Sequence, residues 1–194
     1  MENSDIKKIS VFRHTQNEEL KYVAKNYTNN STYILNIGSV SSREYDKEGC
    51  RYKRYFKTTN YYTLDVYGKK HEKHHIIQDI EKECQSKIKY DLILIMSFFE
   101  HIKNPILALE NIEQQFIHKD TLLYVTLPFI YEYHGEKGCK DYWRFTKDCI
   151  LEMFRHYNII KYREMESVEL NGEDKKNTYS GSCILLKRKY LSID

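Results

Sequence analysis

Polar residues end or follow three apolar segments of the chain, where they could share one ligand. Asn36, Gly38 and Ser39 close the first segment, and Asp65 and Asp79 lie at or after the ends of the next two. A carboxylate at such a position can accept hydrogen bonds from both hydroxyls of a ribose. A second carboxylate can accept from the exocyclic amine of adenine. The spacing therefore indicates a nucleoside site.

A fourth apolar segment is followed by Ser97, Glu100 and His101. Placed at the end of a neighbouring strand, these side chains would face the same crevice and contact the cofactor or the substrate. An adjacent acid and histidine can also be a purely structural pair, because an acid is stabilised at the start of a helix. The sequence leaves both roles open.

A loop after a fifth apolar segment contains the residues best suited to proton transfer. His134 lies among aromatic residues, with Asp141 seven positions further on. An imidazole oriented by a carboxylate can take a proton from a hydroxyl near neutral pH. Arg144 would either hold an anionic group through its bidentate fork or fix the loop by a salt bridge. Tyr131 and Tyr142 are either substrate contacts or aromatic anchors.

Seven apolar segments are long enough, and short enough, to be the strands that position these residues. They span 33–38, 61–66, 75–80, 90–97, 121–127, 158–165 and 182–188. Apolar residues recur at helical spacing over 17–27, after Asn104-Pro105, and over 147–155. Residues 1–30 are expected to form an N-terminal segment with one helix.

Strands that alternate with helices predict an α/β fold, because each helix covers one face of a mostly parallel sheet. The last two strands are joined too closely for a crossover helix, so they add an antiparallel edge. We expect a Rossmann-like three-layer sandwich with a seven-stranded sheet, in a single domain over 1–194. Ligands of such sheets bind beyond the carboxyl ends of the strands.

Composition excludes several classes of site. The 7 glycines are too scattered for a glycine-rich phosphate loop, and the 5 cysteines include no CxxC pair that would hold zinc. His71, His74 and His75 have spacing that could bind a metal on a helix, but they precede a strand without a fixed partner, so we expect no metal site. Free thiols and the absence of an apolar signal core predict a cytoplasmic protein.

Charge and hydropathy also limit the partners. The 31 Lys and Arg residues are balanced by 28 Asp and Glu, so nucleic acid is not the expected partner. The basic and aromatic run 51–57 is either a solvated face or a small RNA-binding patch. No apolar run approaches the length of about 20 residues that spans a bilayer. A monomer or a homodimer is expected.

Two blocks of the sequence resemble the class I S-adenosylmethionine-dependent methyltransferases, specifically the type-11-like group. The first runs from Tyr90-Asp91-Leu92-Ile93-Leu94 through Glu100-His101-Ile102 to Asn104-Pro105. The second runs from Leu127-Pro128-Phe129 through His134-Gly135 to Asp141-Tyr142-Trp143-Arg144-Phe145-Thr146. The resemblance covers roughly residues 32–188. It implies S-adenosylmethionine as cofactor and an O-methyltransferase acting on a small-molecule or glycan acceptor.

The resemblance also assigns roles to residues. Asn36 stands where the group has an acid, and the Gly38–Ser39 loop would contact the methionine part of the cofactor. Asp65 would hold the ribose and Asp79 the adenine. Methyl transfer is an in-line displacement, in which the enzyme aligns the nucleophile and removes its proton. His134 with Asp141 is the predicted base.

The first loop departs from the group, because Ser39-Val40-Ser41-Ser42 contains no further glycine. Side chains there add Cβ bulk and restrict positive φ. An alternative function is therefore a catalytically inactive methyltransferase fold that serves as a binding or regulatory protein. A further alternative, an RNA methyltransferase, rests on the basic run 51–57 alone.

Overall fold

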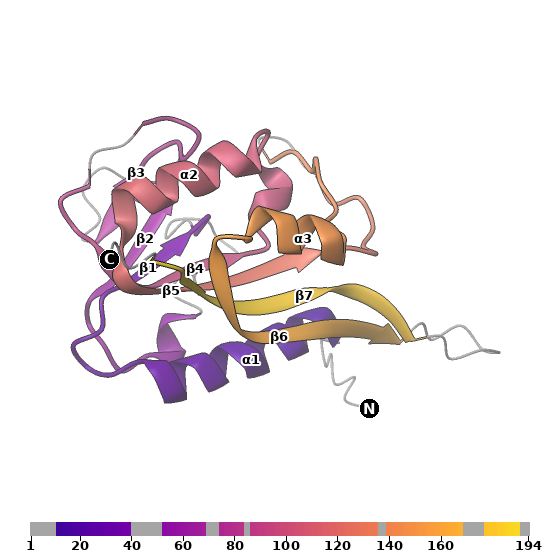
Figure 1. Ribbon diagram of the computed structural model, residues 1–194, viewed down its shortest axis with the longest axis horizontal. Coiled ribbons are helices and arrows are strands. Elements are labelled where there is room, and N and C mark those ends of the chain that lie inside the picture. The colour runs from indigo at the N-terminus through magenta and orange to yellow at the C-terminus, as the bar shows by residue number, and fades with distance from the viewer. Residues whose placement is uncertain are drawn as a thin grey trace, which may run out of the picture.

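Seven strands form one sheet in the order β3-β2-β1-β4-β5-β7-β6 in the computed structural model (Figure 1). The structure describes residues 11–39, 52–68, 74–83, 86–135, 139–168 and 177–190. The strands are β1 Ile34–Ile37, β2 Tyr61–Asp65, β3 His75–Ile77, β4 Tyr90–Met96, β5 Ile117–Pro128, β6 Tyr157–Val168 and β7 Asn177–Arg188.

Strands β1 to β5 are parallel, and only β7 runs antiparallel to its neighbours β5 and β6. The predicted mostly parallel sheet with an antiparallel edge is therefore confirmed. Successive side chains of its central strands point to opposite faces of the sheet, and both faces are apolar. Leu35 and Ile93 point to one face, and Ile34 and Leu92 point to the other.

Helices cover both faces and complete the three layers (Figure 1). Helix α1, Val11–Tyr27, lies against β5, β6 and β7 on the face of Ile34. Helices α2, Pro105–Phe116, and α3, Lys147–Met153, contribute to the core on the face of Leu35. No helix in the part of the chain that the structure describes is long and apolar enough to cross a membrane.

Capped helix starts hold the two segments that carry the predicted chemistry. Asn104 caps α2 by accepting a hydrogen bond of 3.1 Å from the Leu107 amide, and Pro105 follows in the first turn. Thr146 caps α3 by accepting 3.2 Å from the Cys149 amide. The segments 97–103 and 139–145, which precede these caps, are therefore fixed at their C-terminal ends.

Several element bounds differ from the sequence prediction. β3 ends at Ile77 instead of residue 80, because the chain turns at Asp79, whose side chain accepts from the Glu81 amide. β6 and β7 pair with each other beyond their apolar parts, so both are longer than predicted. Residues 40–42, His71 and the connection 171–176 lie outside the described residues.

Candidate functional site

The first loop of the predicted cofactor site turns at Gly38, at the end of β1. Gly38 has a φ of +78°, and its amide donates 2.8 Å to the carbonyl of Leu64 on β2. The ring of Phe98 packs directly on it, so a Cβ at position 38 would lie 2.3 Å from Cδ2 of Phe98. Both the backbone conformation and the close contact require glycine.

Gly38→Ala is expected to lower the free energy of unfolding by about 1–3 kcal/mol, because it forces a side chain into the left-handed region against an aromatic ring. Urea denaturation followed by circular dichroism measures the loss. Phe98→Ala removes the overlap but leaves the backbone strain, so in a double-mutant cycle Gly38→Ala should cost less in the Phe98→Ala background than in the parent protein. A Gly38→Ala protein as stable as the parent would contradict this account.

The other predicted cofactor residues end neighbouring strands. The Asn36 side chain is buried on β1, and its amide nitrogen has no hydrogen-bond partner among the described residues. Ser39 follows Gly38 and is partly buried. Asp65 ends β2 and accepts 3.0 Å from the Tyr67 amide. Asp79 follows β3 and forms an ion pair of 3.4 Å with Lys82. The role of each toward a cofactor remains a prediction.

A tight turn at Ser97 follows β4 and leads into a short 3-10 helix. Ser97 has a φ of 49°, and its amide donates to the carbonyl and the hydroxyl of Thr126 on β5, at 3.1 and 3.0 Å. Phe98 then packs on Gly38. Glu100 and His101 lie in the 3-10 helix Phe99–His101, with Glu100 completely buried.

The loop after β5 is organised around Asp141, whose side chain is 0% exposed. Arg144 binds both of its carboxylate oxygens. The guanidinium beside Asp141 holds the pKa of that carboxyl well below its usual range. The remaining N–H groups of Arg144 donate to the backbone carbonyls of Tyr131, Glu132 and Trp143. The structure thus shows the loop-fixing salt bridge that the sequence left as one role of Arg144.

His134 is oriented by the same carboxylate. Its amide donates 2.9 Å to Oδ2 of Asp141, and its ring Nδ1 lies 3.2 Å from that oxygen. The rings of Tyr131 and His101 contact the imidazole edge-on, with centroids 5.2 and 5.0 Å away. The predicted contact between His134 and Asp141 is present, and it leaves Nε2 of His134 for other partners.

Backbone hydrogen bonds bring this loop to the turn after β4. The Tyr142 and Trp143 amides donate to the carbonyl of Glu100, at 2.7 and 3.3 Å. The indole of Trp143 donates 2.8 Å to the Ile102 carbonyl. The Tyr142 ring itself is 44% exposed. The indole N–H of Trp143 therefore anchors the loop, although Trp143 as a whole is 45% exposed, and Tyr142 likewise presents an aromatic surface to solvent.

Glu100 is an unusual acid in this arrangement. Neither of its carboxylate oxygens has a hydrogen-bond partner among the described residues, and Nε2 of His101 is 4.0 Å away. Burial, with a smaller contribution from the nearby Asp141, raises the pKa of Glu100 to about 8. Burial also lowers the pKa of His101. Glu100 and His101, which the sequence predicted to contact the cofactor or the substrate, lie beside His134.

The predicted residues therefore form two groups at the carboxyl ends of the parallel strands. Asn36, Gly38 and Asp65 end the paired strands β1 and β2. Glu100, His101 and His134 meet in the second group, which Asp141 and Arg144 support. Phe98, which the sequence gave no reason to select, bridges the two groups because it follows β4 and covers Gly38.

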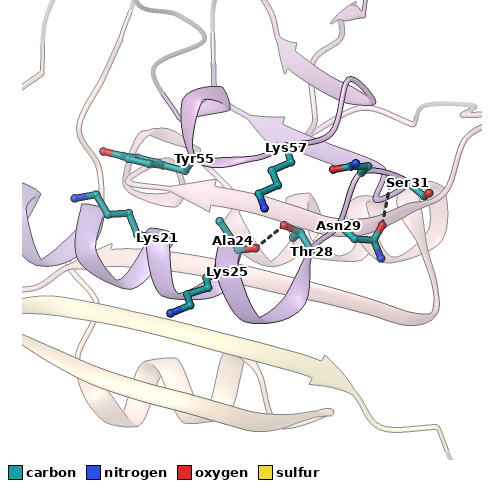
Figure 2. A pocket seen from close by; sticks show the side chains of 9 residues that line it. Lys21, Ala24, Lys25, Thr28, Asn29, Ser31, Tyr55 and Lys57 are labelled. Atoms are coloured by element: carbon teal, nitrogen blue, oxygen red, sulfur yellow. Dashed lines mark hydrogen bonds between the residues drawn. The ribbon is translucent and has the colours of Figure 1, made fainter.

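A basic cavity lies at the opposite end of the sheet. It has a volume of about 520 Å³, and Lys21 and Lys25 of α1 line it together with Tyr55 and Lys57 of the basic run (Figure 2). Residues 29–31, which precede β1, complete its wall. Because the cavity lies before the strands begin, it is separate from the group around His134.

Two histidines of the cluster His71, His74 and His75 are described by the structure, and both have partners. The ring nitrogens of His75 lie 2.7 Å from the Thr63 hydroxyl and 2.8 Å from the Tyr67 carbonyl, and the His74 ring stacks on Tyr62.

Solved structures with a similar fold include several methyltransferases. The N-methyltransferase NodS of Bradyrhizobium japonicum, solved with S-adenosyl-L-homocysteine, is 10% identical, with 97% of this chain and 94% of that one covered and a TM-score of 0.59. The 1,6-didemethyltoxoflavin-N1-methyltransferase of Burkholderia thailandensis is 9% identical, with 90% and 78% covered and a TM-score of 0.62. The chain has the class I methyltransferase fold. Searches of protein-family models and of curated proteins found no match.

A methyltransferase fold does not by itself fix the reaction. The [4+2]-cyclase SpnF is 11% identical to this chain, with 95% of this chain and 85% of that one covered and a TM-score of 0.63. All of these identities are low, so the likeness concerns the fold alone. The function must be argued from the side chains at the ends of the strands.

Proposed function

We propose that the chain is an S-adenosylmethionine-dependent methyltransferase that methylates a hydroxyl of a small-molecule or glycan acceptor. The observation that carries the proposal is the position of His134. A fully buried carboxylate orients its imidazole, and His134 follows the carboxyl end of β5, at the same edge of the sheet as Asn36 and Gly38 of β1 and Asp65 of β2. This edge is where ligands of parallel α/β sheets bind.

The residues at the first two strands fit a nucleoside cofactor. The unpartnered Nδ2 of Asn36 is a buried donor that a ligand would satisfy, and Asp65 offers a carboxylate one strand away. We assign the ribose hydroxyls to Asp65, the adenine amine to Asp79 and the methionine part to the Gly38–Ser39 turn. When bound, S-adenosylmethionine supplies a methyl group on a positively charged sulfur.

The residues around His134 act on the acceptor. Because Nδ1 of His134 faces Asp141 and the Glu132 carbonyl, which both accept, Nδ1 carries the proton and Nε2 keeps a lone pair. Nε2 can then take the proton of an acceptor hydroxyl, and Asp141 stabilises the imidazolium that forms. The exposed rings of Tyr131 and Tyr142 offer the apolar surface on which an acceptor such as a sugar ring packs.

Asp65→Asn tests the cofactor half of the proposal. The substitution keeps an oxygen that can accept from the Tyr67 amide but removes the charge that strengthens hydrogen bonds to ribose. We expect the affinity for S-adenosylhomocysteine, measured by titration calorimetry, to fall about tenfold or more. Asp120→Asn is the matched control, because Asp120 forms an exposed ion pair of 3.0 Å with Lys187. Equal effects of the two substitutions would remove Asp65 from the site.

A binding protein without catalysis is the second candidate. The packing of Phe98 on Gly38 favours it, because this ring covers the turn that a cofactor must approach. The same calorimetry separates the two candidates. Failure of the parent protein to bind S-adenosylmethionine or S-adenosylhomocysteine at millimolar concentration would reject the enzyme and leave the binding protein.

A further inference from the structure

We propose that Glu100, His101 and His134 bind a divalent transition-metal ion. One ligand atom from each of these side chains lies within 4.8 Å of the other two. Zinc binds imidazole nitrogen and carboxylate oxygen at about 2.0–2.2 Å, so two ligands of one ion lie within about 4.4 Å of each other. A small adjustment of the three side chains therefore closes them around an ion.

Both imidazoles are already held in the tautomer that a metal requires. The carbonyl of Lys140 lies 2.6 Å from Nδ1 of His101, and a carbonyl can only accept, so Nδ1 carries the proton. Nδ1 of His134 is fixed in the same way by Asp141 and the Glu132 carbonyl. The free lone pairs are on the two Nε2 atoms. Backbone carbonyls and carboxylates in these positions are the usual supports of metal-binding histidines.

Glu100 supplies the independent observation that points to a ligand. Its side chain is 1% exposed, and its two oxygens have no hydrogen-bond partner among the described residues. A buried acid in that state can keep its charge only at a cost of several kcal/mol, so it either takes up a proton or is paired with a cation such as a metal ion. Arg144 does not supply the pairing, because its N–H groups bind Asp141 and three carbonyls. An ion between Glu100 and the two imidazoles would satisfy the acid.

The ligand set indicates the kind of ion. Two imidazoles and one carboxylate are typical ligands of Zn²⁺ and Fe²⁺, and three protein ligands leave coordination positions open for water or an acceptor oxygen. The binding site does not rest on the proposed function, but its use in catalysis does. A hydroxyl bound to the ion has a lowered pKa and releases its proton to water, while Nε2 of His134 holds the ion instead of a proton. The ion-bound form thus replaces the imidazole as the group that activates the acceptor.

Metal titration of the full chain tests this site. Protein dialysed against EDTA and then against buffer is titrated with Zn²⁺ by calorimetry, and with Co²⁺ by visible absorption. We expect one ion per chain and a loss of affinity of at least about 100-fold in Glu100→Gln, His101→Ala and His134→Ala. Circular dichroism establishes that each variant is folded. His118→Ala is the matched control, because His118 pairs with Asp91 at the opposite end of the sheet and should leave the affinity unchanged.

Two results would overturn the proposal. The first is the absence of saturable binding in the parent protein, and the second is binding that all three ligand variants retain. S-adenosylhomocysteine affinity, measured on the same metal-free samples, keeps the two proposals apart. Cofactor binding without metal binding rejects the ion and keeps the methyltransferase, whereas metal binding without cofactor binding does the reverse.

Discussion

His134→Ala is expected to lower kcat by about 10²- to 10⁴-fold, the range that a positioned acid or base contributes. The affinity for S-adenosylhomocysteine should change little, because His134 lies in the loop after β5 and not at the ends of β1 and β2. Turnover is measured as release of S-adenosylhomocysteine with a panel of hydroxyl acceptors that includes mono- and oligosaccharides. Calorimetry on the same protein gives the cofactor affinity.

His118→Ala serves as control for this substitution too, since it removes an imidazole that is 32% exposed, against 33% for His134, and that also pairs with a carboxylate, Asp91, at 3.1 Å. Full turnover in His134→Ala would mean that another group, or simple proximity of the reactants, carries the step. Loss of cofactor affinity together with turnover would assign His134 a structural role instead. The response of the parent protein to EDTA then distinguishes a base from a metal ligand, because only the ligand role makes turnover depend on the ion.

The fold was predictable because most of its strands are continuous apolar runs with clear stops. Gly38 ends β1, the run 90–96 is buried in the sheet, and Pro128 ends β5. The extensions of β6 and β7 were not predictable, since they are held by backbone pairing between the two strands and carry polar residues. Apolar periodicity reports the burial of apolar side chains, and it gives no signal for a strand that continues through polar residues.

The side chains of the candidate site could be selected one by one from the sequence, but their grouping in space could not. An acid seven positions after a histidine suggested the contact between Asp141 and His134. The neighbourhood of Glu100 and His134 depends on a different interaction, the donation of the Tyr142 amide to the Glu100 carbonyl across 42 positions of chain. Such a backbone hydrogen bond leaves no mark in the residue types. The packing of Phe98 on Gly38 was hidden too, because it joins two residues that are 60 positions apart in the chain.

Arg144→Ala is expected to lower the free energy of unfolding by about 3 kcal/mol, the lower end of the range for removing one partner of a buried ion pair. The carboxylate of Asp141 is fully buried and would be left with two contacts to His134, while three backbone carbonyls would lose their donor. We place the effect at the lower end because the Arg144 side chain is 26% exposed, so that water can replace part of what is removed. Urea denaturation followed by circular dichroism measures the change.

Two further variants give this prediction its specificity. Arg144→Lys keeps the charge but cannot reach both carboxylate oxygens and the carbonyls in one plane, so it should recover only part of the stability. Arg155→Ala breaks an ion pair with Glu152 in which both side chains are more than half exposed, and such pairs contribute about 0–1 kcal/mol. An Arg144→Ala protein that loses no more stability than Arg155→Ala would show that the loop around Asp141 is held by its backbone hydrogen bonds to Glu100 and by the hydrogen bond from the Trp143 indole to the Ile102 carbonyl. His134 would then keep its position without the guanidinium, and the substitution would leave kcat unchanged.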